Sequence, residues 1–185
     1  VQGRTGQTDY VRALERQESL YPADYAKLRF LENHDRPRMA HLFPDRRTRL
    51  NWLCWMFFQK GTALLYSGQE WENDHRPDLF DADPIPMEGP APLEGLIRRL
   101  TALKKEPILA HGAYSLRACP NDTLLAVWKE GERRLTGAFC LRGAPSLVQV
   151  ELPDGRYENL LEPETFLRVE SGLLSLNGHP AVLRG

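Results

Sequence analysis

The spacing of hydrophobic residues changes along the chain. Apolar residues recur every three or four positions over about 8–19, 45–60 and 93–105, which places them on one face of a helix. A strand is predicted at Leu28–Leu31, and the continuous apolar run Thr62–Tyr66 is typical of a strand covered on both faces. Strands alternating with helices predict an α/β region with parallel crossovers.

Beyond about residue 110 the helical period disappears and short strand-like runs replace it. Turn signals such as Pro153-Asp154-Gly155 and Asn177-Gly178 separate these runs. The predicted strands are 114–117, 123–128, 134–141, 147–152, 157–160, 166–169, 173–176 and 181–183. This pattern predicts a small antiparallel β-sandwich. The proline-rich stretch 72–92 that precedes the last helix is predicted to be a long irregular loop, and such loops are usually functional.

Polar residues follow both predicted strands of the α/β region. The first strand leads into Asn33-His34-Asp35, and Pro37 biases the residue before it away from helical geometry. The second leads into Ser67–Trp71. Histidine can titrate near neutral pH and aspartate carries a negative charge. Because ligands bind at the strand ends of parallel α/β folds, these tips are the candidate site.

Composition narrows the classes of protein without selecting one. The 185 residues are 42% hydrophobic and 26% charged, and the net charge of -1 gives no reason to expect nucleic acid or an anionic membrane as a partner. Three widely spaced cysteines (Cys54, Cys119 and Cys140) argue against a disulfide framework or a zinc site and are compatible with the cytoplasm. The chain begins at Val1 rather than Met, so we expect it to be part of a longer protein, whose location the sequence does not fix.

Two of these stretches resemble conserved regions of the α-amylase family of glycoside hydrolases (family 13). Phe30-Leu31-Glu32-Asn33-His34-Asp35 resembles the family's fourth conserved region, at the end of barrel strand seven. Gly61–Trp71 resembles its eighth strand with a Gly-Gln-Glu exit. The resemblance implies that residues 1–109 are the C-terminal portion of a (β/α)8 catalytic barrel, an incomplete segment with strands seven and eight and their helices. It implies that residues 110–185 are a C-terminal β-sandwich domain.

The same resemblance implies an enzyme that hydrolyses or transfers α-glucosidic bonds of oligo- or polysaccharides with retention. Such enzymes need a nucleophile and a general acid/base about 5 Å apart, which in the family lie on strands four and five. This chain contains neither segment, so alone it is expected to be inactive. By resemblance Asp35 is the transition-state stabiliser and His34 binds the same sugar ring, with Asn33 and Arg38 as supports. Glu70 is expected to be a supporting structural carboxylate.

Two other functions remain open. The first is a catalytically inactive relative that keeps the fold as a binding or accessory protein, although retention of His34 and Asp35 counts against it. The second is a metal-dependent phosphohydrolase that uses the His-Asp pair as ligands. That chemistry places the pair on a helix with further histidines, which Pro37 and the preceding strand disfavour. No metal or cofactor is expected in this chain. A calcium site of the full-length protein would lie outside it.

An incomplete barrel also predicts partners. Its apolar strand edges would be exposed and prone to pairing, so we expect the chain to pack against the missing N-terminal half of the barrel, to self-associate, or to be held by the sandwich. An α-glucan or oligosaccharide is the expected substrate. The sandwich is expected to brace the barrel, and sugar contact through Trp128 or Tyr157 is an alternative role for it.

Overall fold

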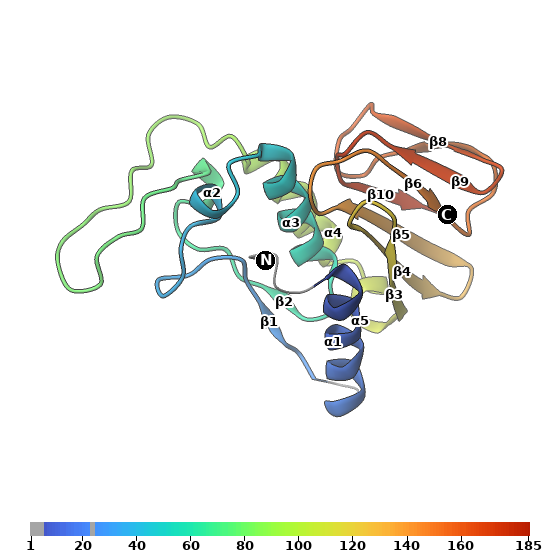
Figure 1. The fold of residues 1–185 in the computed structure, drawn as a ribbon, viewed down its shortest axis with the longest axis horizontal. Coiled ribbons are helices and arrows are strands. Elements are labelled where there is room, and N and C mark those ends of the chain that lie inside the picture. The colour runs from blue at the N-terminus through green and yellow to red at the C-terminus, as the bar shows by residue number, and fades with distance from the viewer. Residues whose placement is uncertain (1–5, 23–24) are drawn as a thin grey trace.

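The computed structural model describes residues 6–22 and 25–185, with helices beside two four-stranded sheets (Figure 1). The helices are α1 (Gln7–Leu20), α2 (Met39–Leu42), α3 (Arg46–Phe58), the 3-10 helix η1 (Gln69–Trp71), α4 (Glu94–Lys104) and α5 (Ile108–His111). The strands are β1 (Leu28–Arg29), β2 (Thr62–Ala63), β3 (Ala113–Cys119), β4 (Thr123–Glu130), β5 (Arg133–Cys140), β6 (Ser146–Gln149), β7 (Gly155–Glu158), β8 (Phe166–Glu170), β9 (Leu173–Leu176) and β10 (Ala181–Arg184). None of the described helices is long and apolar enough to span a membrane.

The C-terminal strands form the predicted antiparallel sandwich. One sheet has the order β10-β5-β4-β3 and the other β6-β9-β8-β7, and each pairing is antiparallel. Asn121 and Asp122 make the tight β3–β4 turn with φ values of 55° and 52°, a left-handed conformation that Asn and Asp tolerate. Between the sheets lies an apolar core that includes Leu125, Val148 and Leu174.

The sheet β10-β5-β4-β3 is covered on both of its faces. Leu125 of β4 faces the second sheet, whereas its neighbours Leu124 and Trp128 belong to a different core that they share with Phe58 of α3. Because side chains alternate along a strand, β4 contributes to both cores. Figure 1 shows α3 and α4 lying beside this sheet. The sandwich therefore buries the apolar face of α3.

The suggestion that Trp128 contacts sugar is wrong. Its side chain is only 1% exposed, and its indole N–H donates to the backbone oxygen of Phe58 at 2.9 Å. Local sequence does not reveal which strand face a helix covers, so this residue looked available. Tyr157 is half-buried against the core between the sheets, and its hydroxyl donates to the backbone oxygen of Pro153.

β1 and β2 pair in parallel, with Leu28 opposite Thr62. Both strands are shorter than predicted, and residues 63–66 are half-buried rather than covered on both faces. The reason is that, within the described residues, these two strands form a sheet of their own. Gly61 permits the pairing because its φ is +104° and a Cβ there would lie 2.1 Å from the Lys27 backbone oxygen. Parallel pairing sets the C-terminal ends of both strands at one edge.

Candidate functional site at the ends of β1 and β2

The Asn33-His34-Asp35 tip is a turn that holds itself in shape. The backbone oxygen of Asn33 accepts the Arg36 N–H at 3.2 Å, and its side-chain Oδ1 accepts the Asp35 N–H at 3.0 Å. The side chains of His34 and Asp35 are 61% and 65% exposed, and Nε2 of His34 lies 3.3 Å from Oδ2 of Asp35. The turn therefore presents an imidazole and a carboxylate side by side to solvent.

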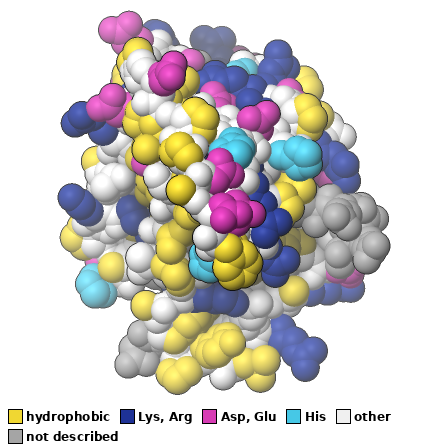
Figure 2. Space-filling view, turned by 90° about the vertical axis from the view of Figure 1, so that its left-hand side faces the viewer, with side chains coloured by type: hydrophobic (Ala, Val, Ile, Leu, Met, Phe, Trp, Pro, Cys, Tyr) yellow, Lys and Arg dark blue, Asp and Glu magenta, His cyan; other side chains and the backbone are white. Residues whose placement is uncertain are grey.

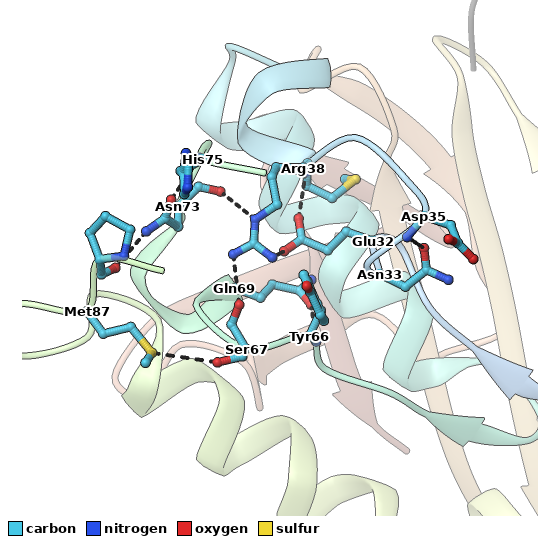
Figure 3. Close-up of polar contacts among 12 residues, drawn as sticks. Glu32, Asn33, Asp35, Arg38, Tyr66, Ser67, Gln69, Asn73, His75 and Met87 are labelled. Atoms are coloured by element: carbon cyan, nitrogen blue, oxygen red, sulfur yellow. Dashed lines mark hydrogen bonds and ion pairs between the residues drawn. The ribbon is translucent and has the colours of Figure 1, made fainter. Parts of the chain in front are cut away.

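A buried ion pair lies beneath this tip. Nη1 of Arg38 is 3.1 Å from Oε1 of Glu32, and the two side chains are 0% and 1% exposed (Figure 3). Oε2 of Glu32 accepts the Met39 N–H at 2.6 Å. Burial raises the pKa of Glu32 above its ordinary value, although the Met39 N–H and the Arg38 guanidinium offset part of that rise.

Arg38 also bonds to the segment that leaves β2. Its Nη2 donates to the backbone oxygen of Ser67 at 2.8 Å and its Nε to that of Asn73 at 3.3 Å. The guanidinium lies 4.8 Å from the centre of the Tyr66 ring, within cation–π range. Gly68 leaves room for it, because a Cβ at this position (φ +84°) would lie 2.7 Å from Nη2 of Arg38.

Glu70 lies in η1, close enough to Glu32 for its charge to raise the pKa of Glu32 further. Oε2 of Glu70 is buried and has no hydrogen-bond partner among the described residues. Glu32, Gln69 and the first residues of the 72–92 loop line a cavity of about 20 Å³ nearby, large enough for one water molecule. Polar groups thus converge below the tip from both strand ends.

The structure separates the predicted site residues into two layers. Asn33, His34 and Asp35 lie together on the exposed turn, whereas Arg38 lies below and supports the turn through Glu32. Sequence reasoning did not single out Glu32. A signal was present in the sequence, because Glu32 and Arg38 carry opposite charges and lie on either side of the tip. It did not indicate a buried pair, because charged residues are rarely buried.

The 72–92 loop begins at this edge and extends away from the helices (Figure 1). It is irregular, as predicted, but fixed by its own hydrogen bonds. Nδ2 of Asn73 donates to the backbone oxygen of Pro86 at 2.6 Å, and His75 pairs with Asp83 at 2.8 Å. Phe80 is 94% exposed. In Figure 2, acidic, basic and apolar side chains of the described residues are interspersed over the side of the molecule that faces the viewer.

The sandwich matches a known protein family. A family model described as the bacterial alpha amylase C-terminal domain matches residues 115–183. A comparison with curated proteins finds no match. Among solved structures, an alpha-amylase from Lactobacillus plantarum is 34% identical, with a TM-score of 0.93 over 100% of this chain. The chain spans 44% of the length of that protein.

More distant structures share the fold alone. A maltogenic alpha-amylase from Thermotoga neapolitana has a TM-score of 0.84 at 22% identity, over 99% of this chain and 46% of its own. An alpha-amylase from Anoxybacillus has a TM-score of 0.75 at 22% identity, over 94% of this chain and 41% of its own. In each case the similarity extends over the helical region as well as the sandwich.

Proposed function

Because the chain matches the C-terminal portion of the α-amylase family, we propose that the polypeptide containing it hydrolyses or transfers α-glucosidic bonds of oligo- or polysaccharides with retention. In this proposal residues 1–109 are the last part of a (β/α)8 catalytic barrel and residues 110–185 are its sandwich domain. The parallel pairing of β1 and β2 carries the proposal, since it places an exposed His-Asp tip and a second polar strand exit at one edge.

The geometry supports a distinct role for each residue of the tip. Asp35 is exposed and negatively charged, suited to stabilise the positive charge that develops on the sugar ring in an oxocarbenium-like transition state. His34 beside it hydrogen-bonds hydroxyls of the same ring. Asn33 fixes the Asp35 backbone through its side-chain oxygen. Arg38 and Glu70 support the tip from below, and the nucleophile and acid/base are supplied by other barrel strands outside this chain.

The partner we propose for the open side of β1 is the remainder of the barrel. Leu28 and Phe30 are 51% and 42% exposed there. They border a groove of about 410 Å³ between β1, α1 and α3. Apolar side chains beside an unpaired strand edge favour pairing with a further strand, and self-association is the alternative way to cover them.

Replacing Asp35 by asparagine in the complete polypeptide tests the function. We expect kcat on a maltooligosaccharide to fall about 100-fold or more, the usual effect of losing one group that stabilises transition-state charge. Thermal stability should not change, because the side chain is exposed. Glu132→Gln, at an exposed position in the β4–β5 turn, is the matched control and should keep full activity.

Two results would overturn this function. Undiminished activity in Asp35→Asn would remove Asp35 from the reaction. A wild-type polypeptide that binds a maltooligosaccharide without cleaving or transferring it would be the inactive binding relative.

A further inference from the structure

The buried pair Glu32–Arg38 connects the exposed tip to the segment that follows β2. We propose that this pair is a positioning device that holds the His34-Asp35 tip and residues 67–73 in one fixed arrangement. The alignment of the tip on the sugar would then depend on two side chains that never touch the sugar. This inference rests on the proposed function, in which the tip contacts the reacting ring.

The pair first closes the tip into a loop of fixed span. Glu32 and Arg38 lie on either side of the turn, and their charged atoms are 3.1 Å apart with almost no exposure. The Met39 N–H holds the second oxygen of Glu32 at 2.6 Å. Separating the ends of the turn would leave a buried charge without its partner, which is strongly unfavourable. The tip therefore keeps its shape without a ligand.

Arg38 then extends the connection to the other strand end. Its two remaining donor groups reach the backbone oxygens of Ser67 and Asn73. Asn73 in turn bonds through its side chain to Pro86, on the returning arm of the 72–92 loop. Figure 3 shows Arg38 lying between Glu32 on one side and Ser67 and Asn73 on the other. One guanidinium thus links the turn 32–38 to residues 67–73, two segments that are far apart in the sequence.

This role is separable from a contribution to stability. A buried ion pair replaced as a unit by apolar side chains of similar size often leaves stability unchanged or higher. Apolar side chains, however, cannot donate hydrogen bonds to Ser67 and Asn73. A protein carrying Glu32→Leu and Arg38→Met together should therefore avoid the unpaired buried charge that Arg38→Met leaves, and still hold its tip poorly.

The test compares Arg38→Met, the Glu32→Leu/Arg38→Met double variant and Leu174→Ala in the complete polypeptide. Leu174 is fully buried between the sandwich sheets, so its truncation lowers stability without touching the pair. The measurements are kcat and KM on a maltooligosaccharide, thermal unfolding, and hydrogen exchange at the Asp35 and Asn73 amides, which bond to Asn33 and Gly68.

Both Arg38 variants are expected to lose about 100-fold in kcat with KM changed less than about threefold, because a shift of about 1 Å in a positioned group has that effect. Hydrogen exchange should accelerate about tenfold at both amides, because the opening of either segment, the tip or residues 67–73, releases the other. The double variant should recover thermal stability relative to Arg38→Met but not kcat. Leu174→Ala should unfold at lower temperature with kcat unchanged.

Wild-type kcat in the double variant, or faster exchange at only one of the two amides, would overturn the proposal. Failure of the proposed function looks different. The wild-type polypeptide would then act on no α-glucoside, while Arg38→Met would still accelerate exchange at both amides and so support the link between the segments.

Discussion

Replacing Asn51 by alanine should show how strongly α3 is tied to the sandwich. Asn51 is fully buried in the middle of that helix. Its Oδ1 accepts the Cys140 N–H at 2.6 Å, and its Nδ2 donates to the backbone oxygen of Gly178 at 2.9 Å. One side chain thus hydrogen-bonds a backbone N–H at the end of β5 and a backbone oxygen in the turn before β10. The alanine variant leaves both backbone groups without these partners at a buried position.

The expected loss follows from those two groups. A buried backbone donor or acceptor left unsatisfied costs about 1–3 kcal/mol, so two of them give about 2–6 kcal/mol. Water entering the space left by the amide would satisfy part of this, and we expect the free energy of unfolding to fall by about 3 kcal/mol. Such a loss is large beside the total stability of an ordinary domain.

Urea denaturation of the 185-residue chain, followed by tryptophan fluorescence, measures this loss. Trp55 and Trp128 report directly, because both are buried in the core between α3 and the sheet. Asn177→Ala is the control, since Asn177 is exposed in the same turn and its side-chain oxygen accepts the His179 N–H, and it should change stability by less than about 0.5 kcal/mol. A loss below about 1 kcal/mol in Asn51→Ala would refute the reasoning.

Two further substitutions test local features. Asp45 caps α3, and the Thr48 hydroxyl and N–H hold the pKa of its carboxyl below the ordinary 3.8, so Asp45→Ala should cost about 1 kcal/mol at neutral pH. The lowered pKa means that these hydrogen bonds stabilise the ionised carboxylate. The difference in the free energy of unfolding between variant and wild type, measured in urea, should therefore vanish as the pH falls through the folded-state pKa. A difference that does not depend on pH would contradict this. Gly68→Ala should lower the free energy of unfolding by about 2–3 kcal/mol through backbone strain and contact with Arg38, measured by thermal unfolding. Gly131→Ala also has a positive φ but open space around it, so it should show the backbone strain alone, about 1 kcal/mol, and equal losses in the two variants would exclude a steric role for Gly68.

Several strands of the sandwich could be predicted from sequence because their limits are set locally, whereas the limits of β6 and β7 differ from the predicted 147–152 and 157–160 by up to three residues. Asn121 and Asp122, and Gly178 in the Asn177-Gly178 turn, adopt left-handed conformations that few other residues accept. β9 spans the predicted residues 173–176, and the observed limits of β5 differ from the prediction by one residue at each end. The two cores were harder to foresee, because the face of β4 that meets a helix depends on tertiary packing rather than on local pattern.

The candidate site could be predicted only in its exposed layer. Asn33, His34 and Asp35 stand out because polar residues interrupt an apolar run before a proline. The layer beneath them depends on Glu32 and Arg38 being buried together. Burial of a charge depends on partners contributed by distant segments, here the backbone oxygens of Ser67 and Asn73. No local pattern in the sequence carries that information.

The two-sided burial of the sheet β10-β5-β4-β3 limits how this sandwich can be exchanged between proteins. A module with one polar outer face could be moved by recombination as an independent unit. Here the outward side chains of the sheet, including Leu124, Trp128 and Phe139, need the apolar face of α3 to cover them. The 115–183 segment that the family model matches does not contain that helix. We therefore expect α3 and the sandwich to be inherited together, so that substitutions in one select for substitutions in the other.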